Sequence, residues 1–165
     1  MASPRQETQE PGLTLRVRRT FAFPREKVFA AWAAPHQLEK WMVRDIPTHI
    51  VTHHKQDIRT GGSYLMEVRD PGKNKTYWGQ GTYEEVIPPQ KIVFTWCWTD
   101  NSPDGPNKHP GSEITRVTVE FFARGAASTE IVLTHGPFVS EKLRNDHNRG
   151  WNGCLDILDR ILQSA

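Results

Sequence analysis

Two histidines, His135 and His147, are the side chains of this sequence best suited to acid–base chemistry. Each falls on an otherwise apolar face, His135 at the end of a strand pattern and His147 on the stripe of a C-terminal helix. Because imidazole titrates near neutral pH, an inward-facing pair could transfer protons or orient a polar group of a ligand. The alternative is that both are core histidines bonded to backbone or water, and the pattern favours this alternative. They remain weak catalytic candidates.

A second polar pair, Asp57 and Arg59, precedes the glycines Gly61 and Gly62. On a strand the two charged side chains share one face. They could hold an anionic ligand or transfer a proton, but the pattern favours an ion pair that fixes the turn. The glycines are expected to bend the sheet through a bulge.

Three further histidines, His49, His53 and His54, suggest a metal site at first sight. At strand rise His49 and His53 are roughly 13 Å apart, which is too far for one ion, and His54 faces the other way. No cysteine or carboxylate set completes the site, and the sequence has no phosphate-binding glycine loop, nucleophile elbow or Cys-x-x-Cys motif. We therefore predict no metal and no cofactor.

The strand expected over residues 91–98 carries the strongest indication of a binding site. Its alternation places Ile92, Phe94, Trp96 and Trp98 on one face. Each aromatic side chain can bury roughly 150–250 Å², and a single helix would not easily cover them all without leaving space. The strand therefore indicates either the wall of a cavity for a small apolar ligand or a solid aromatic core.

Composition limits the classes of partner. The chain has 165 residues, with 21 Lys and Arg against 19 Asp and Glu, so the formal net charge is +2. This length suits one domain, and the charge balance does not support nucleic-acid binding. No apolar run is long enough to span a membrane. With no secretory signal, Cys97 and Cys154 are expected to be reduced thiols in a cytoplasmic protein.

The elements that must position these residues follow from periodicity and turn signals. Residues 1–12 are expected to be a disordered tail before a single domain over 13–165. A strand over 13–20 precedes a helix that Pro24 opens, and a second short helix follows Pro35. Strands are expected over 48–58, 63–69, 76–86, 91–98, 113–123 and 129–135, in an antiparallel meander. The connection over 99–111 is either a cavity mouth or a loose hairpin tip.

A long helix over about 140–163 closes the chain. Leu143, His147, Trp151, Leu155, Leu158 and Leu162 form one continuous face. At 1.5 Å per residue the helix is roughly 35 Å long, enough to cross a small domain. Gly150 and Gly153 lie inside it, either for close backbone contact or to leave room for a ligand.

This order of elements resembles the helix-grip fold, an α+β architecture in which a curved antiparallel sheet of about six or seven strands wraps around the last helix. The motifs are similar to those of the AHSA1-like branch (activator of Hsp90 ATPase homologue-like) of the START/Bet v 1 (SRPBCC) superfamily. They are Phe23 to Trp32, Pro35 with Leu38 and Trp41, Asp57 to Gly62, Ile92 to Trp96, Leu133 to His135, and Gly150-Trp151. The resemblance covers about residues 13–163. Many members have a large aromatic side chain where this chain has Met42, which alters the cavity entrance.

The alternating faces and the resemblance together predict a mostly apolar ligand-binding site. Its expected residues are Trp41, Tyr64, Met66, Phe94, Trp96, Trp98, Phe121, Leu133, His135, His147 and Trp151.

Three functions stay open. The first is a non-catalytic protein that binds a small hydrophobic, lipid-like or aromatic molecule. The second, implied by the resemblance, is a chaperone-associated interaction domain. The third is a cyclase-like or hydrolase-like enzyme using His135, His147 or Tyr83, which the absence of a nucleophile–base motif disfavours. The chain could be a monomer or a homodimer.

Overall fold

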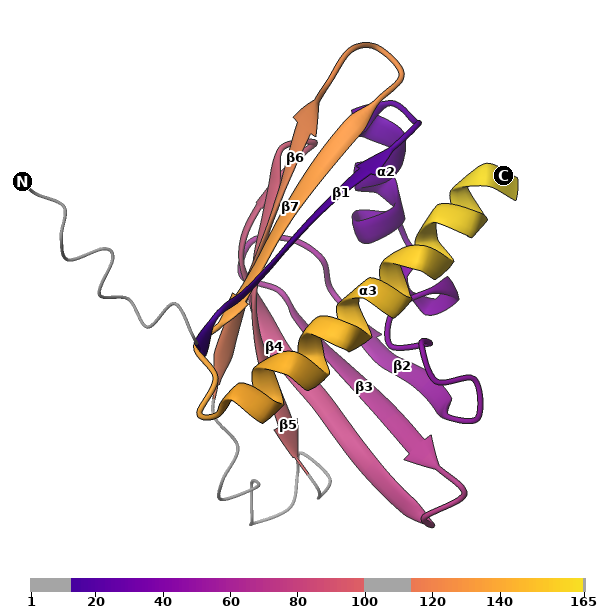
Figure 1. Ribbon diagram of the computed structural model, residues 1–165, viewed down its shortest axis with the longest axis vertical. Helices are drawn as coiled ribbons and strands as arrows, with labels where there is room; N and C mark the ends of the chain where they lie inside the picture. The colour runs from indigo at the N-terminus through magenta and orange to yellow at the C-terminus, as the bar shows by residue number, and fades with distance from the viewer. Residues whose placement is uncertain (1–12, 100–113, 165) are drawn as a thin grey trace, which may run out of the picture.

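The computed structural model describes residues 13–99 and 114–164. The expected tail and almost all of the expected connection over 99–111 lie outside these residues. One antiparallel sheet of seven strands occurs in the order β1-β7-β6-β5-β4-β3-β2, and the α3 helix lies across one of its faces (Figure 1). The predicted helix-grip fold is confirmed.

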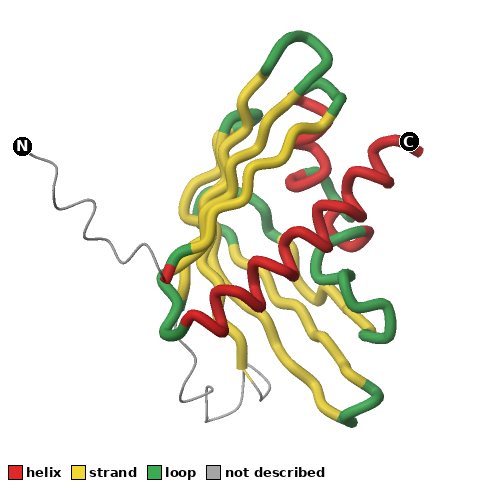
Figure 2. Tube along the Cα trace, viewed as in Figure 1, coloured by secondary structure: helices red, strands yellow, loops and turns green. Residues whose placement is uncertain are grey.

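The strands begin and end close to where alternation predicts. Their bounds are Leu15–Phe21 for β1, Ile50–Gln56 for β2, Ser63–Asp70 for β3, Lys75–Ile87 for β4, Lys91–Thr99 for β5, Thr115–Ala123 for β6 and Thr129–Gly136 for β7. β1 pairs with β7, so the first and last strands of the chain's described part lie side by side (Figure 2). The described part of the chain contains no helix that is both long and apolar enough to cross a membrane.

The connection between β1 and β2 holds the two expected short helices, the second of them as a single 3-10 turn. The α2 helix spans Arg25–Ala33 and buries Val28, Phe29 and Trp32. After Pro35 only a single 3-10 turn forms, η2 at Leu38–Lys40. Trp41 follows this turn and donates its indole N–H to the Ala31 carbonyl at 3.0 Å, which ties the turn to the end of α2.

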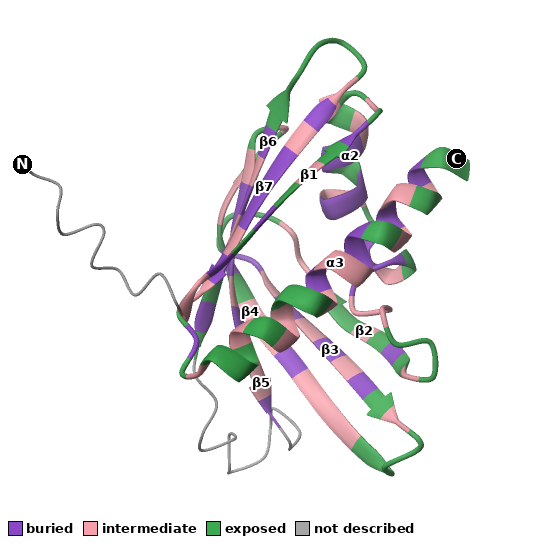
Figure 3. Ribbon diagram, in the orientation of Figure 1, coloured by how far each residue is buried: buried purple, intermediate pink, exposed green. Residues whose placement is uncertain are grey.

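Burial along α3, which spans Glu141–Ser164, changes halfway. None of its first ten residues is buried, whereas the second half buries Trp151, Cys154, Leu155, Leu158 and Leu162 (Figure 3). The predicted apolar stripe is present, but only its second half packs into the core. Space therefore remains beneath the first half of the helix.

The turn before β3 has the predicted ion pair. Arg59 Nε lies 2.9 Å from Asp57 Oδ1. Gly61 has a φ of +90°, a left-handed conformation that glycine adopts without steric cost. The bulges of β2 and β4 lie elsewhere, between His53 and Lys55 and between Tyr83 and Glu85, so the glycines form the turn itself.

Candidate functional site

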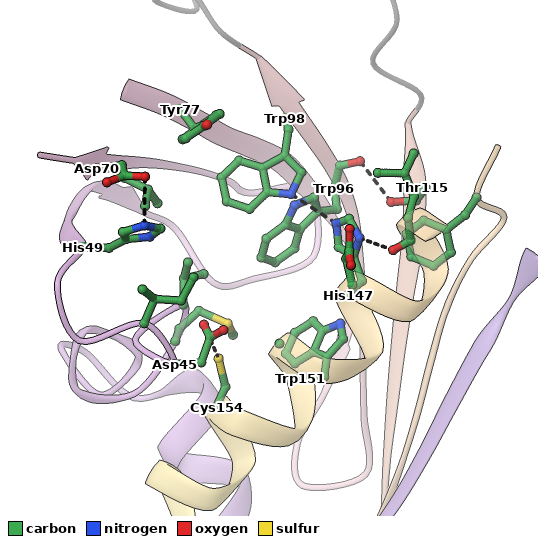
Figure 4. A pocket seen from close by; sticks show the side chains of 18 of the residues that line it. Asp45, His49, Asp70, Tyr77, Trp96, Trp98, Thr115, His147, Trp151 and Cys154 are labelled. Atoms are coloured by element: carbon green, nitrogen blue, oxygen red, sulfur yellow. Dashed lines mark hydrogen bonds and ion pairs between the residues drawn. The ribbon is translucent and has the colours of Figure 1, made fainter. Parts of the chain in front are cut away.

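A cavity of about 800 Å³ lies beneath the first half of α3, where the buried stripe of that helix is missing. Helix α3, strands β3 to β6 and the loops on either side supply its wall. The aromatic members of the wall are Tyr77, Trp96, Trp98, Phe138 and Trp151. A cavity wall, one of the two interpretations of the aromatic strand, is therefore present at Trp96 and Trp98, and Figure 4 shows its side chains.

The tryptophans of the wall pack edge to face against one another. The ring centroid of Trp96 lies 5.4 Å from that of Trp98 and 5.8 Å from that of Trp151, both in T-shaped arrangements. Trp151 also stacks on Trp32 of α2, with centroids 5.9 Å apart. These contacts are of the favourable aromatic type, so the wall of the cavity is fixed before any ligand enters.

His135 is buried behind this wall and both of its ring nitrogens are committed. Trp151 Nε1–H donates to His135 Nδ1 at 3.0 Å. Because an indole only donates, Nδ1 accepts and the proton lies on Nε2, which is 2.7 Å from Thr115 Oγ1. Thr115 Oγ1 in turn donates to the Trp96 carbonyl at 3.2 Å. Burial, and secondarily the neighbouring His147, lowers the pKa of His135 to about 3.

His147 lines the cavity and is held in a similar way. Trp98 Nε1–H donates to His147 Nε2 at 3.3 Å, so the His147 Nδ1–H donates to the Leu143 carbonyl at 2.8 Å (Figure 4). Burial lowers the pKa of His147. Both histidines are thus neutral partners of tryptophans, and neither has an uncommitted nitrogen for proton transfer. His135 lies in the core with side-chain partners rather than the expected backbone or water, and His147 lines the cavity.

Polar side chains form two close contacts in the wall of the cavity. His49 Nε2 lies 3.4 Å from Asp70 Oδ2, and Cys154 Sγ lies 3.6 Å from Asp45 Oδ1 (Figure 4). Burial, with a further contribution from Asp45, raises the pKa of the Cys154 thiol to about 12. Between these groups the rim is apolar, because Ile46, Val139 and Leu143 are between 40% and 59% exposed.

The structure divides the predicted site residues into three groups. Trp96, Trp98, His147 and Trp151 line the large cavity. Tyr64, Met66 and Phe94 lie deeper, around a second cavity of about 20 Å³ that Trp96 also borders. Trp41, Phe121, Leu133 and His135 border neither cavity and fill the core.

Sequence reasoning missed several residues of the wall. Asp45, Ile46 and His49 lie in the loop before β2, and Phe138 and Val139 lie between β7 and α3. Loop residues carry no period, so alternation could not find them. His49 was considered as a metal ligand only. Among the described residues, no three His, Cys, Asp or Glu side chains gather where they could hold a metal ion.

The chain is similar to members of a known protein family. The family model described as "Activator of Hsp90 ATPase homolog 1-like protein" matches residues 22–163. The chain belongs to this family. No curated protein matches the chain.

Several solved structures share the fold. The AHSA1 protein from Silicibacter pomeroyi has a TM-score of 0.74 at 24% identity, with 91% of this chain and 97% of that chain covered. A protein from Arthrobacter aurescens has a TM-score of 0.76 at 19% identity, with 93% of this chain and 88% of that chain covered. Protein Ms6760 from Mycobacterium smegmatis has a TM-score of 0.72 at 22% identity, with 93% of this chain and 92% of that chain covered. At these identities the likeness shows the fold alone.

Proposed function

We propose that this AHSA1-family protein binds a small apolar molecule, preferably aromatic, in the large cavity. The observation that carries the proposal is the cavity of about 800 Å³ beneath the unburied half of α3. Small-molecule sites in proteins typically occupy about 300–1,000 Å³, have mostly apolar walls and contain few polar groups. This cavity has that size and that composition.

Aromatic ligands suit the wall better than flexible chains do. Trp96, Trp98 and Trp151 present edges and faces already held by packing and, for Trp98 and Trp151, by hydrogen bonds to histidines. A rigid planar ligand loses little conformational entropy and gains edge-to-face contacts with such a wall. His135 and His147 act in this proposal as positioning residues, because they fix the orientation of the indoles.

Titration with N-phenyl-1-naphthylamine, a dye whose emission rises in apolar surroundings, tests the proposal. We expect saturable binding, displaced by one class among fatty acids, sterols, flavonoids and polyketides. The matched pair of variants is Trp98→Leu in the cavity wall and Trp78→Leu, since Trp78 lies on neighbouring β4 and borders neither cavity. Trp98→Leu should weaken binding about tenfold and Trp78→Leu should leave it unchanged. Equal weakening by both variants, or no saturable binding, would contradict the proposal.

The family description supports a second candidate, an interaction with an Hsp90-class chaperone. The edge strand β2 offers a surface for it, since Ile50 on that strand is 47% exposed. The ATPase rate of a purified chaperone, measured with and without this protein, tests the candidate. An unchanged rate at saturating protein would argue against it.

A further inference from the structure

The second cavity, of about 20 Å³, is large enough for one water molecule or one hydroxyl group. It lies in the core beneath η2, and Trp32, His53 and Trp96 are among the residues around it. One probe sphere of about 10–15 Å³ is enough to admit a water-sized group, provided that two to four polar partners surround it. The volume is therefore sufficient, and the polar partners decide what it can hold.

Three residues that line this inner cavity each carry a buried nitrogen atom with no hydrogen-bond partner among the described residues. These atoms are Trp32 Nε1, His53 Nε2 and Trp96 Nε1. Trp32 and Trp96 are only 2% and 5% exposed, so bulk water does not satisfy them. Other indoles of the core are paired, as Trp41 is with the Ala31 carbonyl and Trp151 is with His135. An unpaired buried donor or acceptor is costly, and three such atoms on residues that line one cavity indicate a common partner.

A hydroxyl group matches these three atoms in number and in polarity. The two indole N–H groups only donate, and a hydroxyl oxygen accepts two hydrogen bonds. Its single proton can then be donated to His53 Nε2, when that imidazole carries its proton on Nδ1. Burial lowers the pKa of His53 to about 4, while Glu39 and Arg44 act on it in opposite directions. The neutral imidazole favours an uncharged hydroxyl over a carboxylate.

The inner cavity is also placed to receive part of a ligand from the large one. Met42 and Trp96 border both cavities, so these two side chains form the partition between them. Methionine has three rotatable bonds and a polarisable thioether, and it adapts to neighbouring groups. Movement of Met42 would let a small polar group pass while the body of the ligand stays in the large cavity.

We infer that the inner cavity is a hydroxyl-binding subsite, and that the ligand is an aromatic molecule carrying a hydroxyl group. The inference rests on the proposed function for the body of the ligand. Trp32, His53 and Trp96 bind the hydroxyl, and Met42 admits it. Water has the same chemistry and is the alternative occupant.

Displacement of N-phenyl-1-naphthylamine by 1-naphthol and by naphthalene separates these possibilities. The two competitors differ by one hydroxyl group. If the ligand supplies the oxygen, the wild-type protein should bind 1-naphthol about tenfold more tightly than naphthalene, as one to two new hydrogen bonds allow. Equal affinities would overturn the inference, with water as the occupant, and leave the proposed function standing. Failure of both competitors and of the dye to bind would overturn the proposed function and the inference together.

A matched pair of tryptophan variants localises the effect. Trp32 borders the inner cavity only, so Trp32→Phe removes one donor there, while the phenyl ring keeps an aromatic contact with Trp151 of the large-cavity wall. Trp41→Phe is the control, because Trp41 contacts Trp32 but borders neither cavity. Trp32→Phe should lower the preference for 1-naphthol about fivefold, the value of one hydrogen bond, while keeping naphthalene affinity, and Trp41→Phe should retain the full preference. An unchanged preference in Trp32→Phe would overturn the inference.

A measurement on the unaltered protein guards against misfolded variants. In ¹H–¹⁵N spectra the indole N–H signals of Trp32 and Trp96 should move downfield when 1-naphthol is added. Naphthalene should not produce this shift, because it offers no oxygen acceptor. Identical shifts with both compounds would refute the hydroxyl subsite.

Discussion

Replacing Gly150 and Gly153 by alanine should change stability in opposite directions, although both glycines lie inside α3. A β-carbon at position 150 would meet Asp45 Oδ2 at 3.6 Å, an ordinary van der Waals contact. A β-carbon at position 153 would meet Asp45 Cβ at 2.8 Å, closer than two such carbons can lie. Because Asp45 Cβ is attached directly to the backbone, rotation of the side chain cannot relieve the overlap, and the loop must move.

The magnitudes follow from helix propensity and packing. Alanine is favoured over glycine in a helix interior by about 1 kcal/mol, so Gly150→Ala should raise the free energy of unfolding by about that amount. The melting temperature should rise by about 3 °C. At position 153 the same gain opposes an overpacking cost of about 1–3 kcal/mol. The effect of Gly153→Ala on the free energy of unfolding should therefore lie between no change and a loss of about 2 kcal/mol.

Urea unfolding followed by circular dichroism measures both variants, with an unchanged dependence on urea as the check that the unfolding remains comparable. A double-mutant cycle with Asp45→Gly isolates the contact, since this change removes the Asp45 β-carbon. In that background Gly153→Ala should become stabilising by about 1 kcal/mol. Equal stabilisation by the two single variants would refute the close contact between Asp45 and Gly153.

Three further predictions concern the buried polar groups. The pKa of His135 is lowered to about 3 in the folded protein, against 6.5 for an ordinary histidine. As the pH falls from 7 to 5 only the unfolded chain takes up this proton, so the free energy of unfolding should fall by about 2 kcal/mol. Urea unfolding at several pH values checks this, and His135→Gln should remove about 2 kcal/mol of the dependence, leaving the share of His53, whose pKa is lowered to about 4. Trp151→Phe should lower the free energy of unfolding by about 1–3 kcal/mol, because it leaves His135 Nδ1 unpaired. A loss of less than about 1 kcal/mol in urea unfolding would contradict a stabilising hydrogen bond between Trp151 and His135. Cys154, studied in a Cys97→Ser variant, should react with a thiol reagent only on unfolding, since burial raises its pKa to about 12; rapid labelling of the folded protein would contradict this.

The fold could be predicted because each strand carries its own alternation. Thr115, Val117, Val119 and Phe121 are all buried on β6, as the period of two requires. The same holds for β7, where even His135 lies on the buried face. The second expected helix takes the 3-10 form, because an apolar period of three or four over Leu38 to Met42 also fits a single 3-10 turn.

The cavity could be predicted only in part. The aromatic face of β5 indicated it, yet Phe94 packs against Tyr64 and Tyr83 while Trp98 faces the large cavity. The same face therefore serves the solid core at one end and the cavity at the other, and both interpretations of the strand hold for different residues. Alternation gives the face of a residue but not the height of the helix above it.

The two helix glycines connect the fold to the site. Asp45 approaches α3 so closely at Gly153 that the loop before β2 packs against the helix just after the cavity, where Trp151 and Cys154 are already buried. At Gly150 the missing side chain leaves part of the cavity wall open beside Asp45. Close contact and room for a ligand were alternative explanations for these glycines. Gly153 provides the contact that fixes the end of the cavity, and Gly150 provides the room. A side chain larger than alanine at position 150 would therefore reduce ligand affinity. It would do so without the loop displacement that alanine at position 153 requires.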